Sequence, residues 1–308
     1  MNELTIVMYH YVRPIKGTEY PGIKGLELDG FLRQLDYLNE EYTIISQNDV
    51  VNAIKRDKPL PGNACWLTFD DGYKDHYKYV LTELQSREIT ASFFPPRSAI
   101  QESQLLDVNS VHFILEKSCR IDTLSIEIEQ MCLHGGIKKD KISEFRKEFC
   151  VSNRFDNSLT IYVKRLLQHL LPESLRRDII SELFMRYVGQ SEIKFAQELY
   201  MSVDEIKNLL KAGMSIGSHG SNHCWLDQIG RNRQEKDIKQ SLSFLEELGV
   251  PIKDWVMCYP YGAFNNDTLD IVSKMGAAVG VTTRVSKALL SKDNPLTLPR
   301  FDTNDFVQ

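Results

Sequence analysis

The chain has 308 residues, enough to bury a full core as one large domain or as one domain with an insertion. Hydrophobic residues make up 42% and charged residues 26% of the chain, the balance of an ordinary globular protein. The formal net charge of −5 disfavours nucleic acid and strongly acidic membrane surfaces as partners. The six cysteines form no CxxC pair, so we expect reduced, buried thiols rather than a zinc-cysteine site.

The N-terminal segment lacks the basic start and the long apolar stretch of a secretory signal. If Met1 is the true start, we expect the protein to stay in the cytoplasm. No apolar run reaches the roughly 18 residues that a transmembrane helix needs, so no such helix is expected.

Short apolar runs alternate with helical patterns up to about residue 100. Strands are predicted at Leu4–Tyr9, Cys65–Phe69 and Ile89–Phe94. Helices are predicted around Phe31, Leu35 and Leu38, with Asp29 as the N-cap, and around Tyr77, Val80, Leu81 and Leu84.

The alternation resumes near residue 201, where Ser202–Glu205 has the pattern of a capping box. Further strands are predicted at Met214–Ser218, Trp255–Tyr259 and Ala277–Thr282, and helices at 233–248 and Asp267–Met275. Repeated strand-helix units favour an α/β fold with a parallel sheet or a (β/α) barrel, built from residues 1–100 and 201–308.

Residues 101–200 interrupt this rhythm with helical patterns at Val111–Cys119, Ile126–Leu133 and Leu159–Leu171. We interpret the stretch as a helical insertion within the barrel. It is either a packing or oligomerisation element, which we favour, or a lid that shapes substrate choice.

Two acidic side chains follow a predicted strand in the segment Thr68–Gly72 (TFDDG). Strand ends are where barrel enzymes keep their chemistry, although Asp-Asp-Gly alone is often only a solvated turn. The segment Ser218–His223 places His219 and His223 four residues apart after another strand. If that segment turns helically, both imidazoles can face one ion; the alternative is a surface histidine pair.

One aspartate and two histidines make a three-ligand site with open positions, which suits zinc or a similar divalent ion and indicates catalysis. The second aspartate is then free to act as a base on a bound water. Tyr259–Gly262 also follows a strand, and its turn could expose a backbone N–H to a developing oxyanion; in isolation it is equally a surface turn.

Together these motifs resemble those of the polysaccharide deacetylases of carbohydrate esterase family 4, the NodB-homology group. Thr68–Gly72 matches the family's TFDDG motif, and His219–His223 is similar to its H-[ST]-x-x-H motif, with Gly220 in the Ser/Thr place. Pro260–Gly262 looks like the core of the third motif, and Ala91–Phe94 like the strand after the first helix. The resemblance covers roughly residues 4–100 and 201–302.

The resemblance implies a distorted (β/α) barrel of seven or eight strands. It implies Asp70 as general base and Tyr261 as the oxyanion donor. It implies a divalent metal held by Asp71, His219 and His223, with zinc expected and nickel or cobalt as alternatives.

The chain departs from the family at Cys258, where the third motif usually has an arginine that steadies the base. We hypothesise that Arg300 replaces it. No histidine follows His223 to serve as general acid, but Val7–His10 looks like the family's late strand moved to the front, as in circularly permuted relatives. We therefore predict His10 as the general acid, with a core histidine as the alternative.

The predicted reaction is hydrolysis of an N-acetyl group on an amino sugar of a glycan. Without a secretory signal, a nucleotide-linked or lipid-linked precursor is the more natural carbohydrate substrate. Two alternatives stay open, namely hydrolysis of another amide or formamide and a catalytically weak carbohydrate-binding protein on the same fold. The sequence does not indicate the oligomeric state.

Overall fold

The computed structural model describes residues 3–306. The chain divides into two compact units. The first unit comprises Met1–Pro14, Gly25–Gln104 and Gln197–Gln308. The second comprises Ile15–Lys24 and Leu105–Ala196, so it includes a short N-terminal segment that no sequence pattern assigned to it.

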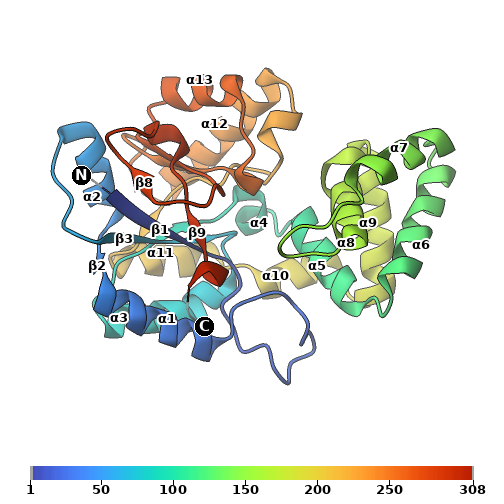
Figure 1. Cartoon of the computed structure of the whole chain (residues 1–308), viewed down its shortest axis with the longest axis horizontal. Coiled ribbons are helices and arrows are strands. Elements are labelled where there is room, and N and C mark those ends of the chain that lie inside the picture. The colour runs from blue at the N-terminus through green and yellow to red at the C-terminus, as the bar shows by residue number, and fades with distance from the viewer. Residues whose placement is uncertain (1–2, 307–308) are drawn as a thin grey trace. The chain divides into compact units, whose positions relative to one another are not determined.

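The first unit is built on β1 (Glu3–Tyr9) and β3 (Ala64–Asp70), which pair in parallel from Leu4 opposite Ala64 to Tyr9 opposite Phe69. Five short strands complete this seven-stranded sheet: β2 (Thr43–Ile44), β4 (Ser92–Phe94), β5 (Ser215–Ile216), β8 (Ala288–Leu289) and β9 (Phe301–Asp302). β1 lies between β3 and the C-terminal strand β9 (Figure 1). The first strand therefore lies beside the last, as the proposed strand relocation requires.

A second, two-stranded parallel sheet contains β6 (Val256–Cys258) and β7 (Val279–Val281). Single bridges connect the sheets, from Ser218 to Met257 and from Val281 to Leu298. Among the described residues the regular strand pairing thus forms two sheets rather than one continuous barrel sheet. Parallel strands alternating with helices confirm the predicted α/β class.

All seven residues of β3 are buried, which is typical of a strand covered on both faces. On one face Trp66 packs near Phe94 in a core that also includes residues of β6 and β7. On the other face Phe69 stacks between Tyr9 and Phe93, with ring centroids 4.8 and 4.9 Å away. Two packed faces hold the carboxyl end of β3 in place, and this end carries the acidic motif.

The helices of the first unit are α1 (Leu28–Glu41), α2 (Gln47–Arg56), α3 (Leu81–Ser86), α4 (Arg97–Gln101), α11 (Val203–Lys211), α12 (Arg231–Glu247) and α13 (Asn266–Lys274). A π-helical turn, His76–Val80, precedes α3. The Ser202–Glu205 capping box is confirmed, with Glu205 N donating to Ser202 Oγ at 3.2 Å. The Asp29 cap is wrong: the N-cap is Glu27, and Asp29 lies in the first turn, where its charge favours the helix dipole.

The strands predicted around β4, β5, β6 and β7 exist but are shorter than the apolar runs that indicated them. Nearly all of the flanking residues are still buried, but isolated backbone hydrogen bonds hold them, such as that from Cys258 N to Ser218 O at 2.8 Å. An apolar run indicates which residues are buried, but not how many of them pair with a neighbouring strand. Here the pairing ends where the chain turns into the loops of the site.

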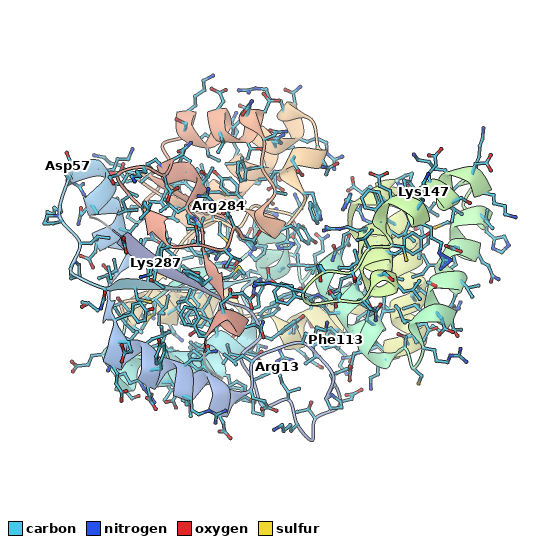
Figure 2. All side chains as sticks on the ribbon, viewed as in Figure 1. Arg13, Asp57, Phe113, Lys147, Arg284 and Lys287 are labelled. Carbon is cyan, nitrogen blue, oxygen red and sulfur yellow. The ribbon has the colours of Figure 1, made fainter. Side chains whose placement is uncertain are left out.

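The second unit is helical, with α5 (Asp107–Lys117), α6 (Ile121–His134), α7 (Lys139–Phe149), α8 (Ser158–Arg165), a π-helical turn Leu166–Leu170, and α9 (Glu173–Val188). α10 (Glu192–Leu199) runs from this unit into the first. Phe113 is fully buried in its core (Figure 2), with its ring 4.5 Å from that of Phe195 and 4.8 Å from that of Tyr20. The ring of Tyr20 and the hydrogen bonds of Gly22 to Glu116 and of Lys24 to Asp156 attach residues 15–24 to this unit. None of the described helices combines the length and apolar character that a membrane crossing requires.

Candidate active site

The carboxylate of Asp70, at the end of β3, is bound by the guanidinium of Arg300, and both side chains are buried. Nη1 donates to Oδ1 at 2.8 Å and Nη2 to Oδ2 at 2.7 Å, a bidentate pair. The remaining Arg300 donors reach Thr68 Oγ1, the Thr282 carbonyl and Cys258 Sγ. Burial alone would raise the pKa of Asp70, but the Arg300 guanidinium lowers it to about 2.

Arg300 therefore lies next to Cys258, the position where the family's third motif usually carries its arginine. The distance from Nη2 to Sγ is 3.3 Å. The chain places a guanidinium on Asp70 from just before β9 instead of from the end of β6. This is the geometry that the hypothesis about Arg300 requires.

Asp71, His219 and His223 converge on one point, and all three are buried. Asp71 Oδ1 is 3.3 Å from His219 Nε2 and 3.2 Å from His223 Nε2. His219 Nδ1 donates to the Cys258 carbonyl at 2.7 Å, which leaves Nε2 as the ring nitrogen that faces Asp71. Burial alone would raise the pKa of Asp71, but the two imidazoles lower it well below its ordinary value.

This donor set fits a divalent metal ion. Within residues 3–306, Asp71 Oδ1 is buried and has no hydrogen-bond partner, although a buried carboxylate oxygen normally has one. Two imidazole nitrogens and one carboxylate oxygen are zinc-type ligands, and three ligands leave a position for water or substrate. A cation among these three atoms would satisfy the unpartnered oxygen.

The segment between the two histidines is not helical, so the two imidazoles meet without the helical turn that the prediction took as its condition. Gly220 and His223 adopt the left-handed conformation, with φ of 70° and 48°. The loop wraps around Asp237 of α12, which accepts hydrogen bonds from the backbone N–H groups of Ser221 and Asn222 at 2.8 and 2.9 Å. A Cβ at Gly220 would lie 2.8 Å from Asp237 Oδ2, which explains why glycine replaces the family's Ser/Thr.

Left-handed backbone also occurs at Asp71 and Tyr261, with φ of 69° and 59°. Non-glycine residues adopt this region at a cost of order 1–3 kcal/mol each, and they concentrate at functional sites. The turn after β3 continues through Gly72, where φ is 70° and a Cβ would lie 2.8 Å from Pro95 Cβ. Two consecutive left-handed residues thus let both aspartates face the same side of the sheet.

Tyr261 and His10 complete the predicted set. The Tyr261 ring contacts that of His223 at 4.7 Å and stacks on Trp225 at 4.4 Å. His10 follows β1, its side chain is 41% exposed, and its Nε2 is 3.9 Å from Asp70 Oδ2. The structure thus brings all seven predicted residues to one site, six of them at the ends of strands or in the segments that follow and Arg300 just before β9: His10, Asp70, Asp71, His219, His223, Tyr261 and Arg300.

Three residues near the site were not identified from the sequence. Asp237 holds the histidine loop, Tyr73 donates from its hydroxyl to Asp71 Oδ2 at 2.5 Å, and His76 Nε2 donates to the His10 carbonyl at 2.8 Å. The position of Tyr73 directly after the TFDDG motif was the one available signal. Asp237 and His76 lie on helical segments that carry no motif.

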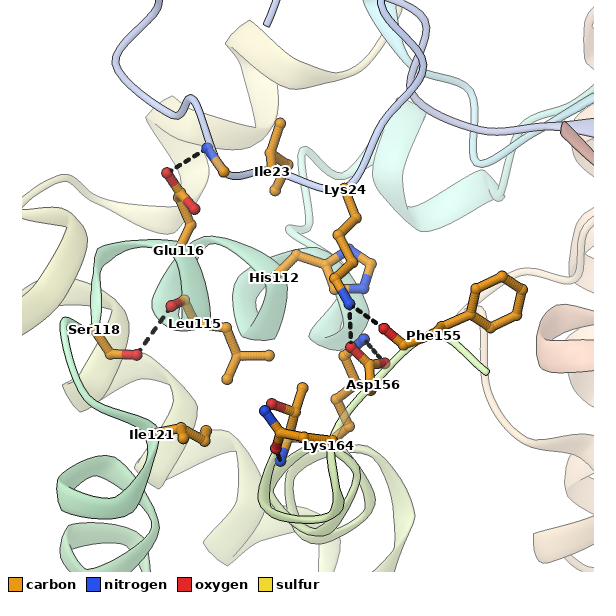
Figure 3. Close-up of a pocket in the computed structure, with 13 residues that line it drawn as sticks. Ile23, Lys24, His112, Leu115, Glu116, Ser118, Ile121, Phe155, Asp156 and Lys164 are labelled. Carbon is orange, nitrogen blue, oxygen red and sulfur yellow. Dashed lines mark hydrogen bonds and ion pairs between the residues drawn. The ribbon is translucent and has the colours of Figure 1, made fainter. Parts of the chain in front are cut away.

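The second unit contains a separate cavity of about 320 Å³. Lys24 and Lys164 both point toward Asp156 (Figure 3). Lys24 Nζ lies 2.5 Å from Asp156 Oδ1, and Lys164 Nζ lies 2.7 Å from Oδ2. The Lys24 ammonium also donates to the Phe155 carbonyl. Both lysines that line the cavity are thus paired with an acidic side chain of the same cavity. None of the seven site residues lines it.

Comparison with known proteins agrees with the motifs. The sequence profile described as polysaccharide deacetylase matches residues 57–131 and 183–280, together more than half of the chain. YxkH of Bacillus subtilis (strain 168), a curated protein assigned to the polysaccharide deacetylases, is 25% identical over 141 residues. That match covers 46% of this chain and spans about half of the relative, 47% of its length.

Solved structures share the fold over nearly the whole chain. The Streptococcus pyogenes deacetylase PplD, solved in complex with acetate, has a TM-score of 0.60 at 18% identity and covers 97% of this chain and 92% of its own. IcaB from Ammonifex degensii has a TM-score of 0.57 at 17% identity, with coverage of 97% and 91%. At 97% coverage, both structural alignments also include the segment between the two parts of the profile match, residues 132–182. The profile match covers more than half of the chain and includes the aspartate and histidine motifs, which shows that the chain belongs to the polysaccharide deacetylase family.

Proposed function

We propose that the protein is a metal-dependent hydrolase that removes N-acetyl groups from an amino sugar in a glycan or glycan precursor. The observation that carries this proposal is the pairing of two aspartates with different partners. Asp71 faces two imidazoles, while Asp70, one residue earlier, is bound by Arg300 and stays out of that cluster. One carboxylate is thus available as a ligand and the other as a base.

Asp71, His219 and His223 would hold the ion, for which we propose zinc, with nickel or cobalt as alternatives. Such an ion polarises an acetyl carbonyl and lowers the pKa of a water bound to it. The chain supplies the orientation, because the His219 bond to the Cys258 carbonyl fixes which ring nitrogen faces the ion.

Asp70 would take the proton of the attacking water. Its low pKa keeps it ionised at neutral pH, and Arg300 holds both of its oxygens in a fixed plane. The partly exposed His10, next to Asp70, would deliver a proton to the departing nitrogen. The backbone N–H of Tyr261 would donate to the tetrahedral oxyanion.

The two alternative functions differ from this one in what is released. Hydrolysis of a formamide would use the same residues and release formate. A sugar-binding protein without turnover would not need a positioned base, whereas Arg300 uses five hydrogen bonds around Asp70 and its neighbours. The bidentate bond to Asp70 favours the hydrolase.

The test is an acetate-release assay with purified protein over N-acetylated oligosaccharides and nucleotide sugars, with and without a chelator. We expect acetate from at least one substrate class, loss of release on chelation, and recovery when zinc is added. Formate from a formylated substrate, without acetate from any, would support the formamide alternative. Glycan binding by calorimetry without either product would support the binding protein.

The matched variants are Asp70→Asn and Asp57→Asn. Asp70→Asn removes the base and should lower turnover by at least about 100-fold. Asp57 ends α2 and is exposed, and its left-handed backbone suits asparagine equally well. Asp57→Asn should leave the rate unchanged, and equal rates for all three proteins would contradict the assignment of Asp70.

A further inference from the structure

The hydroxyl of Tyr73 is bonded to one of the two carboxylate oxygens of Asp71. Tyr73 Oη donates to Asp71 Oδ2 at 2.5 Å, and Tyr73 is 1% exposed. The other oxygen, Oδ1, is the atom that faces His219 and His223. The two oxygens of one carboxylate are therefore divided between a proton donor and the imidazole cluster.

The Tyr73 ring is fixed from several sides. It stacks on Tyr11 with centroids 4.2 Å apart and on Tyr200 with centroids 6.1 Å apart. The His76 ring lies in a T-shaped arrangement with the Tyr73 ring, with centroids 5.6 Å apart. The backbone is tied down as well, because Met201 N donates to the Gly72 carbonyl at 2.9 Å. The hydroxyl thus cannot swing away from Asp71 without moving a packed stack.

A carboxylate bound in this way offers an ion one oxygen instead of two. Zinc forms four-coordinate sites in which imidazole nitrogens and a carboxylate oxygen are ordinary ligands. Calcium takes six to eight oxygen ligands, with carboxylates often bidentate, and manganese prefers an oxygen-rich octahedral set. Loss of the second Asp71 oxygen is therefore a larger penalty for these ions than for zinc.

We propose that Tyr73 is a positioning residue that selects the metal: its hydroxyl restricts Asp71 to one-oxygen ligation and so favours a zinc-type ion over oxygen-seeking cations. The inference rests on the metal site of the proposed function. It goes further by assigning the selectivity to a side chain that does not itself face the ion.

The experiment measures the dissociation constants of Zn²⁺ and Mn²⁺ by competition with a fluorescent chelator, for the whole chain stripped of metal. Tyr73→Phe removes the hydroxyl and keeps the ring in its stack. We expect Zn²⁺ to bind about 10–100-fold more weakly, as is typical when a partner of a ligand is lost. We expect Mn²⁺ binding to stay the same or strengthen, so that the preference for zinc narrows.

Tyr200→Phe is the matched control, since it removes a hydroxyl from the ring stacked on Tyr73 while leaving the contact to Asp71 in place. It should change neither constant. Unchanged Zn²⁺ binding in Tyr73→Phe would overturn the inference, and so would an equal loss for both ions, which would mark a purely structural role. A wild-type protein that binds neither ion would overturn the proposed metal site itself.

A second measurement needs no variant. In a structure of the zinc-loaded wild-type protein, we expect Asp71 to bind the ion through Oδ1 alone, with the Tyr73 hydroxyl still on Oδ2. Bidentate binding by Asp71 would overturn the inference while leaving the proposed function intact.

Discussion

Replacing Arg300 by methionine should strongly destabilise the first unit. Arg300 is 1% exposed, Asp70 is 2% exposed, and two hydrogen bonds of 2.7 and 2.8 Å join them. The variant keeps an apolar side chain of comparable length but leaves the Asp70 carboxylate buried without its main counter-charge. Breaking a buried pair in this way costs about 3–5 kcal/mol, because the remaining charge stays desolvated.

The double variant separates this cost from simple loss of packing. In Asp70→Asn with Arg300→Met, neither buried charge remains, so the penalty of an uncompensated ion disappears. We expect the double variant to lose less stability than the sum of the two single variants, by about 1–3 kcal/mol.

Urea denaturation in the presence of a chelator, followed by tryptophan fluorescence, gives these values. Trp66, Trp225 and Trp255 are the three tryptophans of the chain, and all lie in the first unit. The signal therefore reports the unit that contains the pair. Strictly additive losses, or a loss under about 1 kcal/mol for Arg300→Met, would refute the reasoning.

Three further predictions use the same denaturation assay or simple kinetics. Gly220→Ala should lose more stability than Gly213→Ala, by about 1 kcal/mol or more. Both glycines have positive φ, but only at Gly220 would the new Cβ contact Asp237. Equal losses for the two variants would contradict this explanation. His10→Ala should lower turnover about 100-fold or more while zinc binding persists, and loss of zinc binding would argue against its role as an acid. Burial lowers the pKa of His76 to about 4 from an ordinary value of 6.5. As the pH falls, the unfolded chain binds a proton at this histidine before the folded chain does. The contribution of neutral His76 to the free energy of unfolding is therefore fully present above pH 6.5 and is lost as the pH falls toward 4. The loss between pH 7 and pH 5 is about 2 kcal/mol. His76→Gln should remove that part of the pH dependence, and an unchanged slope would refute the assignment.

Local patterns predicted the elements of the first unit well because their causes are local. The capping box at Ser202 depends on residues three positions apart, and the buried strand β3 is an uninterrupted apolar run. The lengths of β5 to β7 could not be predicted, since apolar residues stay buried beyond the last ladder pair. The inclusion of residues 15–24 in the helical unit depends on contacts between distant parts of the chain, such as that of Tyr20 with Phe113 and that of Lys24 with Asp156.

The candidate site shows the same division. The residues proposed as ligands and base lie in short motifs, so their spacing was informative. The backbone that directs them was not predictable, because the left-handed conformations at Asp71, His223 and Tyr261 are imposed by surrounding packing. Asp237 belongs to the middle of a helix, where a lone buried acid has no signature, although it organises the loop between the two histidines.

The bond between Arg300 and Asp70 spans 230 residues of sequence, which has a consequence for biosynthesis. A ribosome releases the aspartate long before the arginine that neutralises it. Until the segment with Arg300 emerges, the strand that carries Asp70 would have to bury a bare charge or remain hydrated. Premature closure around the acidic turn is thereby disfavoured, and the candidate site is completed only after the segment that carries Arg300 has been synthesised.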